Sequence, residues 1–528
     1  MSEIPIIEPE PAFRGRRLAT AALIVASATA ASRVFGYVRE IATAGYFGAG
    51  ADMSAFDVAF LVPATVQIII AQAALSAALI PVFAGLLEKG QRREAWLVAR
   101  TVFTMVTLIM GGLVIICIIF APQIMPIFAP GYRGDPVMMA QIVRMTRLLF
   151  PTVVLLALTG IVASILNSFE HFTLPAVAPI FWNLIILLAI VFGHERLGVD
   201  ALAWGILLGT VVQLAMQLPA LRGRGGRLGW SLAWRNPNVR RVGALLLPVS
   251  VSLGLINLNG VVDVQFASFL GDGGVAAMTF AFRLYQLPEA LFAIAVGTVL
   301  FPTLSRLAAR RDRDAFRSKI TQGLRVIFFL LIPASAFMLA LSEPVVRLAY
   351  EHGRFTPGNT ELVASVLFFF ALGSAFSGGS TLLTRGFFSL GKPWLPTTAA
   401  VGNLAVNAFL NWLFIKRFGL GGISLSTSVV SGVTFVVLLA LIRRELGRID
   451  GRAILRSGIT VIIASAIAAA AAYLSWRGLD TSLGRGLLAQ IISMAGALAA
   501  GFVVFLTLAW LTHMPELQQL RNIRRSRR

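Results

Sequence analysis

The sequence has few charged residues. Charged side chains make up 13% of its 528 residues and hydrophobic side chains 57%, whereas a soluble domain carries about a quarter charged residues. So small a charged fraction cannot cover the water-facing surface of a chain this long. The mean hydropathy of +0.82 agrees with this. The composition therefore excludes an ordinary soluble enzyme and indicates a membrane protein.

Thiol and imidazole groups are also scarce. The single Cys117 lies in the apolar run LVIICIIF, so the chain cannot form an internal disulfide and has too few thiols for a metal cluster. The four histidines lack the spacing of metal ligands; they are His171, His194, His352 and His513. No Walker A lysine motif or strand-associated dinucleotide motif is present. We therefore predict no metal site, no cofactor and no enzymatic activity.

Apolar runs long enough to cross a bilayer recur from about residue 18 to residue 512. A membrane-spanning helix needs roughly 20 apolar residues, and Gly, Pro and charge clusters divide the chain into about fourteen such runs. The predicted spans are 18–46, 54–86, 95–120, 139–168, 174–193, 199–221, 242–270, 275–304, 320–349, 361–390, 395–416, 422–442, 454–476 and 486–512. We therefore expect an all-α integral membrane protein, with both termini on one side because the number of spans is even.

Basic residues give the chain a net charge of +21, but they lie in short clusters between the apolar runs. This pattern is typical of cytoplasmic loops that face anionic lipid, and it argues against a nucleic-acid site. All the main clusters fall on one side of the predicted topology. They lie at 14–17, 89–100, 222–241, 306–319, 443–456 and 521–528. By the positive-inside rule this side is the cytoplasm, so both termini are predicted to be cytoplasmic.

A faint repeat relates the two halves of the chain. The stretch FGAGADMSAFDVAFLVP begins at Phe47 and resembles LGDGGVAAMTFAFRLYQLP, which begins at Leu270. Both stretches run inward from the outer side, so the repeat is parallel and predicts two similar six-helix lobes. Pro63 and Pro288 fall inside the repeated helices and are expected to act as bending points. The predicted parts are a tail at 1–17, a first lobe at 18–221, a basic linker at 222–241, a second lobe at 242–442, two further helices within 443–512 and a basic tail at 513–528.

Several ionisable residues fall within the predicted spans, where each needs a partner or a wet cavity. Arg33, Arg39 and Glu40 lie on the first helix, Arg283 and Glu289 on the eighth and Asp263 on the seventh. Arg33 and Arg39 are about 9 Å apart along a helix and on different faces, so they can flank one cavity. Arg39 and Glu40 also fit a structural ion pair that holds helices in register. If arginines from both lobes converge, their planar groups suit a pyrophosphate or a carboxylate.

The residues around the first arginines resemble a known family. The stretch SRVFGYVREIATAGYFGAGADMSAFDVAFLVP is similar to the first two helices of the MurJ (MviN) lipid II flippases, within the superfamily of multidrug, oligosaccharidyl-lipid and polysaccharide exporters. Further similar stretches follow in family order: LLFPTVVLLALTGIVASILNSFEHFTLPAVAPIFWN, VDVQFASFLGDGGVAAMTFAFRLYQLPEALFAIAVGTVLFPTLSRLA and EHGRFTPGNT. The resemblance covers most of the chain, and the last two helices are its least distinctive part.

The resemblance implies a mechanism and a substrate. It implies alternating access by two six-helix lobes around a central cationic cavity, with the last two helices forming a groove for a polyprenyl tail. The implied substrate is lipid II or a related anionic polyprenyl-pyrophosphate lipid, flipped to the outer leaflet of the bacterial cytoplasmic membrane. Cell-wall synthesis proteins are the implied partners. Arg33 and Arg39 match the family's first-helix arginines, Glu40 matches the adjacent acidic position, and Arg283 matches the eighth-helix arginine.

The sequence also departs from the family pattern. Gln67 and Ile68 stand where basic residues are expected after the proline of the second helix. Ser54 stands where an acidic residue is usual, with Asp52 and Asp57 nearby as substitutes. These differences leave open an exporter of another polyprenyl-linked glycan, or a divergent paralogue with an altered substrate or a scaffolding role. Cation-coupled export of small molecules would instead require a cavity dominated by carboxylates, which the arginines disfavour.

Overall fold

The structure, a computed structural model, describes residues 11–69, 72–447 and 451–517. Within these ranges, the side chains of residues 11–22, 68–69, 72–74, 247–249, 251–257 and 452–453 are not described. The basic cluster at 521–528 within the predicted tail, the side chains of the cluster at 14–17 and the side chain of Ile68 therefore lie outside the described residues. Every regular element in the described ranges is helical, which confirms the predicted all-α class.

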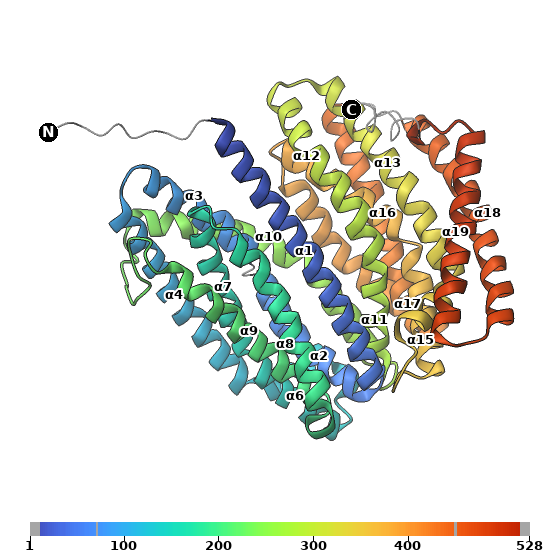
Figure 1. The fold of residues 1–528 in the computed structure, drawn as a ribbon, viewed down its shortest axis with the longest axis horizontal. Helices are drawn as coiled ribbons and strands as arrows, with labels where there is room; N and C mark the ends of the chain where they lie inside the picture. The colour runs from blue at the N-terminus through green and yellow to red at the C-terminus, as the bar shows by residue number, and fades with distance from the viewer. Residues whose placement is uncertain (1–10, 70–71, 448–450, 518–528) are drawn as a thin grey trace. The chain divides into compact units, whose positions relative to one another are not determined.

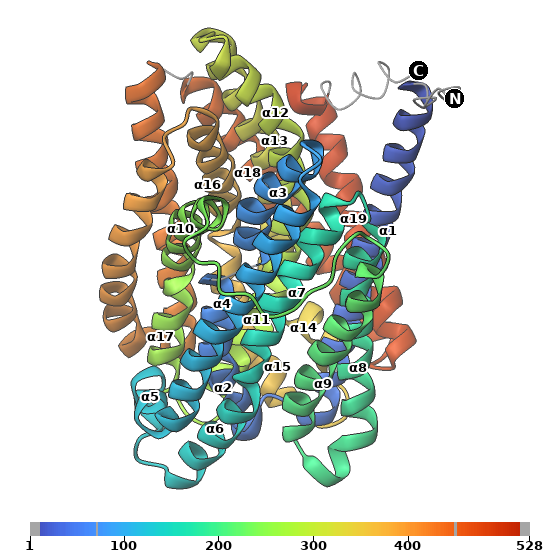
Figure 2. The same ribbon diagram turned by 90° about the vertical axis from the view of Figure 1, so that its left-hand side faces the viewer.

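The helices of the N-terminal half match the first seven predicted spans (Figures 1 and 2). The second and fourth spans each consist of two helices in succession, α2 with α3 and α6 with α7. The bounds are α1 Pro11–Phe47, α2 Ala51–Ile69, α3 Gln72–Glu88, α4 Arg92–Ile119, α5 Ala121–Phe128, α6 Pro136–Leu149, α7 Pro151–Ser168, α8 Thr173–Leu197, α9 Asp200–Gln217 and α10 Pro237–Ala267, with short 3-10 turns η1 Pro130–Tyr132 and η2 Leu218–Leu221.

The C-terminal half continues in the same way. A π-helical segment, η3 Glu289–Ala293, follows Pro288 directly, so the predicted bending point coincides with a change in helix type. The other bounds are α11 Gly274–Pro288, α12 Ile294–Ala309, α13 Arg313–Ala340, α14 Ser342–Tyr350, α15 Pro357–Ala371, α16 Ser374–Ser389, α17 Trp394–Leu446, α18 Gly451–Leu483 and α19 Leu487–Leu511. Nine helical stretches in the described chain are long and apolar enough to cross a membrane, and α15 with α16, bent by 48°, forms a tenth if counted as one span.

The longest helix, α17, contains two predicted spans. Its 53 residues would extend about 80 Å if straight, well over twice the ~30 Å hydrocarbon core. Gly419 interrupts it with φ 53° and ψ −130°, a backbone conformation that glycine adopts readily. The break separates the spans predicted at 395–416 and 422–442. Helix length and local sequence therefore agree that the chain turns at this point.

The described helices form two compact units. The first contains the residues up to Phe47, Ala55–Phe128 and Asp135–Asn257, and the second contains Gly48–Ser54, Ala129–Gly134 and the residues from Leu258 onward. The division falls within α10, after the basic linker at 222–241. Two turns of the N-terminal half, 48–54 and 129–134, thus belong to the second unit.

The core of the first unit lies between α3, α4 and α7. Phe83, Trp96 and Phe169 meet there, with the Phe83 ring edge-on to both others at centroid distances of 6.0 and 5.7 Å. The basic linker covers this core, because Trp96 Nε1 donates to the carbonyl of Arg224 and Gly226 lies against the indole. A Cβ at Gly226 would come within 2.3 Å of the Trp96 ring, so only glycine fits at that position.

The second unit has one core between α12, α13, α16 and α17 and another between α13, α18 and α19. In the latter, the Phe329 and Phe505 ring centroids lie 5.3 Å apart. Figure 1 shows α18 and α19 side by side, at the end of the colour range. Ion pairs add to this packing: Arg347 of α14 bonds Asp480 of α18, and Arg325 of α13 bonds Glu516, which follows α19, at 2.7 Å. The last two helices are thus joined to the rest of the second unit through α13 and α14.

Candidate functional site

The first candidate feature is the charged end of α1. Arg39 Nη2 lies 3.3 Å from Glu40 Oε2, and the Arg39 guanidinium carbon lies 5.1 Å from the centre of the Trp182 ring on α8. Glu40 is only 4% exposed, and a buried carboxylate needs a partner of this kind. The ion pair joins neighbours on one helix, whereas the cation–π contact with Trp182 links α1 to α8.

Arg33 lies in a different environment on the same helix. Its side chain is exposed, whereas the Arg39 side chain retains 14% of its accessible surface. One turn of α1 is also fixed by Asn183, whose side-chain amide donates to the carbonyl of Ser32 at 3.4 Å. The first unit therefore presents one exposed and one largely buried arginine on α1.

Arg283 belongs to the second unit, on α11. It is partly buried and follows Phe282, whose ring stacks on Tyr285 with centroids 5.7 Å apart. Phe370 of α15 packs against both rings. Arg283 thus follows directly on a cluster of three aromatic rings in the second unit. Arg33 and Arg39 belong to the first unit.

The predicted acidic partners near the start of α2 differ in burial. Asp52 is exposed in the first turn of α2, and Asp57 is 8% exposed one and a half turns later. Ser54, which stands in the usual acidic position, accepts a hydrogen bond from the Ala276 backbone N–H at 3.1 Å. It therefore satisfies an N–H in the first turn of α11 that the helix itself cannot satisfy. Gln67, further along α2, is partly buried.

Asp263 contacts amides and a hydroxyl in the described structure. Its Oδ1 accepts from Asn411 Nδ2 at 2.9 Å and its Oδ2 from Thr427 Oγ1 at 3.0 Å. Asn411 also donates to Asn407 Oδ1 at 3.1 Å. Asn411 and Thr427 lie on opposite sides of the Gly419 break, so this cluster connects both arms of α17 to α10. A buried carboxylate among neutral oxygen ligands can take up a proton or a small hard cation.

Glu289 forms a second, partly buried cluster, which the sequence indicated only as a charge within a span. It is the first residue of η3, and its Oε1 accepts from Ser377 Oγ at 2.9 Å and from Thr381 Oγ1 at 3.4 Å, both on α16. Irregular helix in a membrane occurs where side chains or water satisfy the backbone and polar groups. In the sequence, Pro288 indicates the position at which α11 changes into the π-helical segment η3.

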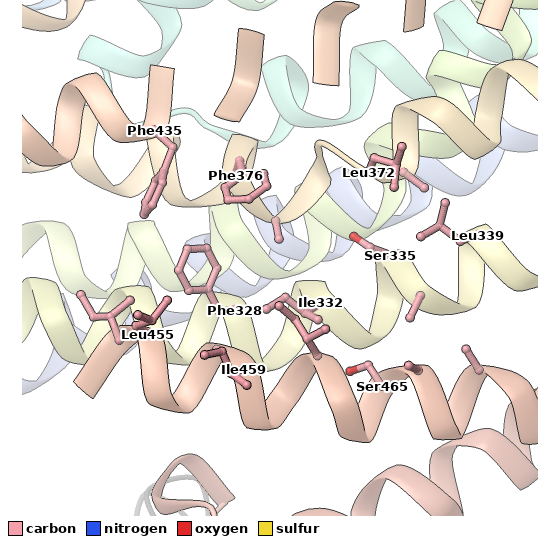
Figure 3. A pocket seen from close by; sticks show the side chains of 18 of the residues that line it. Phe328, Ile332, Ser335, Leu339, Leu372, Phe376, Phe435, Leu455, Ile459 and Ser465 are labelled. Carbon is pink, nitrogen blue, oxygen red and sulfur yellow. The ribbon is translucent and has the colours of Figure 1, made fainter. Parts of the chain in front are cut away.

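An apolar groove runs along α18 within the second unit (Figure 3). Its volume is about 1030 Å³, and its walls come from α13, α15, α16, α17 and α18. The walls include aromatic and aliphatic side chains, among them Phe328, Phe368, Phe376, Phe435, Leu455 and Ile459. Arg443, in the last turn of α17, and Gly451, the first residue of α18, lie at one end. An amphiphile with a long hydrocarbon chain fits such a surface.

Among the described residues, no three His, Cys, Asp or Glu side chains lie close enough together to hold a metal ion. His194, one of the four scattered histidines, lies in the last turn of α8 with its ring 4.3 Å from that of Tyr46. The ionisable clusters of the spans are therefore built from arginine, single carboxylates, amides and hydroxyls.

The sequence matches known proteins over most of its length. A family model for the lipid II flippase MurJ matches residues 43–492. A probable lipid II flippase MurJ of Rhizobium meliloti (strain 1021) is 30% identical over 499 residues, 92% of each chain. A lipid II flippase MurJ of Burkholderia cenocepacia is 30% identical over 431 residues, 80% of this chain and 84% of the relative.

Solved structures share the fold. A lipid II flippase MurJ in an inward closed conformation aligns with a TM-score of 0.79 at 23% identity, covering 93% of this chain and 99% of the other. An inward-facing multidrug resistance MATE family transporter of the MOP superfamily aligns with a TM-score of 0.66 at 15% identity, covering 80% and 98%. At these identities the structural similarity establishes the architecture alone.

Proposed function

The chain belongs to the lipid II flippase MurJ family, and we propose that it moves lipid II from the inner to the outer leaflet of the bacterial cytoplasmic membrane by alternating access. The family match over residues 43–492 carries this proposal. The family consists of transporters, so the chain acts on its substrate by moving it rather than by changing its bonds.

The substrate head group is proposed to bind to Arg33 and Arg39 of the first lobe and Arg283 of the second. Lipid II carries a pyrophosphate between its polyprenyl chain and its sugars, and a guanidinium can donate two parallel hydrogen bonds to phosphate oxygens. Glu40 and Trp182 support this assignment, because their contacts with Arg39 orient its side chain. Asp52 and Asp57 remain proposed charge partners at the start of α2.

The polyprenyl tail is proposed to lie in the groove along α18 (Figure 3). Moving apolar surface out of water is favourable by about 25 cal/mol per Å², but a tail that stays in lipid gains little from this effect. The groove therefore acts by shape and contact, guiding the chain while the head group crosses.

Asp263 is proposed to bind the coupling ion. The sequence has no Walker A lysine motif, so energy must come from a gradient, a membrane potential or the flux of substrate. The cluster of Asp263, Asn411 and Thr427 joins α10 to both arms of α17. A proton or monovalent cation bound there would change the charge at a junction of three helical segments.

We place both termini in the cytoplasm, because the basic clusters between the spans alternate with loops that contain few basic residues. The cytoplasmic loops and outer turns are then available to cell-wall synthesis proteins on the two faces of the membrane.

Export of another polyprenyl-linked glycan is the second candidate. It is favoured by the uncharged Gln67 and Ile68, where the family pattern has basic residues. Complementation separates the two candidates: a strain depleted of its own lipid II flippase is supplied with this protein. Growth would support lipid II as substrate, and lysis despite normal membrane insertion would favour the other glycan.

A further inference from the structure

A separate pocket lies in the basic linker that follows α9, within the first unit. Its volume is about 690 Å³, and it is formed by η2 and the loop RGRGGR at 222–227. Arg222 and Arg227 line it, and no acidic residue is among its described lining residues. Its apolar wall consists of Leu218, Leu221 and Leu228. The pocket therefore combines two cationic side chains with one apolar side.

The loop also carries backbone N–H groups suited to an anion. Gly223 and Gly225 have φ of 76° and 80°, a left-handed conformation that glycine adopts at little steric cost. The N–H groups of Gly223, Gly225 and Gly226 donate to no acceptor among the described residues, and all three glycines line the pocket. Turns with closely spaced left-handed residues commonly form concave N–H sites that bind anions. The N–H groups thus add to the donors of the two arginines.

Contacts on its inner side fix the loop in place. Arg224, between the two left-handed glycines, is not part of the described lining. Its Nε donates to the Ala220 carbonyl at 2.7 Å, and its guanidinium carbon lies 5.4 Å from the centre of the Phe169 ring. The Arg224 carbonyl accepts from Trp96 Nε1 at 3.3 Å. Because the loop is held in this way, a ligand would not have to order it on binding.

The charges around the loop favour a phosphate. A Cβ at Gly225 would lie 3.6 Å from Arg92 Nη1, so a third guanidinium, from α4, flanks the loop. Glu94 on the same helix is bonded elsewhere, because its Oε1 accepts from the side chains of Asn236 and Asn238 at 2.7 and 3.1 Å. A phosphate has three or more acceptor oxygens, whereas a carboxylate has two. Donors from two arginines and several N–H groups therefore match a phosphate better than a carboxylate.

The chain beyond the pocket is suited to the membrane surface. Ser231 faces α4: its Oγ lies 3.0 Å from Thr101 Oγ1, and its N–H donates to Thr104 Oγ1 at 3.1 Å. Its neighbours Trp230 and Leu232 are 73% and 63% exposed. Tryptophan is enriched where a membrane meets water. The pocket thus lies next in sequence to a segment suited to the level of lipid head groups.

We propose that this pocket is a binding site for a phosphate group, carried by an anionic phospholipid or by a soluble phosphate ester. Arg222 and Arg227 bind the phosphate oxygens, and the N–H groups of the glycine loop complete the site. The exposed Trp230 and Leu232 favour the lipid as the source of the phosphate. The site goes beyond the proposed transport function, because it uses none of Arg33, Arg39 and Arg283. Basic pockets at the cytoplasmic side of membrane proteins commonly bind anionic head groups.

The test is binding to the full-length protein in nanodiscs of phosphatidylcholine. Calorimetry measures inorganic pyrophosphate and glycerophosphate, and electron paramagnetic resonance measures how strongly spin-labelled phosphatidylglycerol is immobilised relative to spin-labelled phosphatidylcholine. We expect a preference for phosphatidylglycerol. Arg222→Gln and Arg227→Gln should each weaken it by roughly 10-fold, as expected for loss of charge-assisted hydrogen bonds. Both side chains are exposed, so the melting curves should not change.

The matched control is Arg235→Gln. Arg235 is an exposed arginine of the same linker, its guanidinium carbon lies 4.9 Å from the centre of the Trp234 ring, and it does not line the pocket. This change removes the same charge and should leave the preference for phosphatidylglycerol intact.

Two glycines of the linker test the backbone part of the site. Gly223→Ala places an L-residue at φ 76°, so the loop must change conformation, and binding should weaken several-fold. Gly229 has no left-handed φ, and a Cβ there would meet Arg100 Cδ at an ordinary 3.7 Å. Gly229→Ala should therefore bind normally.

The outcomes separate the sources of the phosphate and can overturn the site. Immobilised phosphatidylglycerol that depends on Arg222 and Arg227 identifies the lipid. Pyrophosphate or glycerophosphate binding that depends on these arginines, with no preference between the two lipids, identifies a soluble ester. Losses in Arg235→Gln as large as those in Arg222→Gln would show general surface charge instead of a site. Unchanged binding in both pocket variants, or no binding of any probe, would also overturn the proposal.

Discussion

The guanidinium carbon of Arg39 lies 5.1 Å from the centre of the Trp182 ring, on a neighbouring helix. Cation–π contacts of this kind contribute about 0.5–2 kcal/mol and keep the planar group in a fixed orientation. With Glu40 at 3.3 Å, the charge of Arg39 is held at a defined place on α1. The same contacts therefore support both helix packing and the proposed recognition of an anionic head group.

Replacing Arg39 should impair transport, because both the planar shape and the positive charge of its side chain are proposed to bind the head group. Arg39→Lys keeps the charge but loses the planar fork, and we expect at least a ~10-fold slower appearance of lipid II in the outer leaflet. Arg39→Ala should abolish rescue of a flippase-depleted strain. Arg240→Ala, an exposed change in the basic linker, is the control at matched membrane levels. Full activity of Arg39→Ala would remove Arg39 from the proposed head-group site.

The Asp263 cluster makes separate predictions for stability and transport. Asp263→Leu leaves the donors of Asn411 and Thr427 without their acceptor, so the free energy of unfolding should fall by about 1–3 kcal/mol per unsatisfied group. Asp263→Asn retains an acceptor oxygen and should fold more stably than Asp263→Leu, yet lose transport if the carboxylate binds the coupling ion. Thermal unfolding in detergent and rescue of growth measure the two effects. A fully active Asp263→Asn protein would exclude the coupling role.

The turn at 129–134 should tolerate a methyl group at one glycine and not at another. A Cβ at Gly131 would lie 2.3 Å from the Ser268 backbone, whereas a Cβ at Gly134 meets nothing within 4 Å. Gly131 also donates to Ser268 Oγ at 2.9 Å. Gly131→Ala should therefore lower the unfolding free energy by about 1–3 kcal/mol and increase labelling of a cysteine placed in the turn. Gly134→Ala should change neither; equal effects would contradict the close contact.

The break in α17 should require glycine at position 419. Gly419 has φ 53°, and an L-residue in a left-handed conformation costs about 1–2 kcal/mol. Gly419→Ala should lower the melting temperature, whereas Gly402→Ala, in a helical part of α17 with open space around it, should not. The melting curves of the purified variants give the comparison. A stabilised Gly419→Ala protein would mean that the two spans form one straight helix.

The sequence predicted the helices well because length and hydrophobicity specify a membrane span locally. Pro288 marked the π-helical junction, and Gly419 falls between two predicted spans. The short helix α5 after the third span was not predicted, because eight residues with an internal proline resemble a loop. Local patterns thus define where helices lie along the chain.

Contacts between helices were harder to predict. Arg39 meets Trp182, and Asp263 meets Asn411, across more than 140 residues of sequence. Helix rotation, which packing determines, decides such pairs, and a single sequence does not specify it. For the same reason Glu289 was visible as a charge within a span, but its partners Ser377 and Thr381 were not.

The most direct test follows lipid II itself. Cells depleted of their own flippase and supplied with this protein are treated with a membrane-impermeant reagent that modifies lipid II only in the outer leaflet. We predict that wild-type protein restores outer-leaflet lipid II, while the triple variant Arg33→Ala, Arg39→Ala, Arg283→Ala does not at equal membrane abundance. Lipid II that remains in the inner leaflet despite correctly inserted wild-type protein would contradict the account.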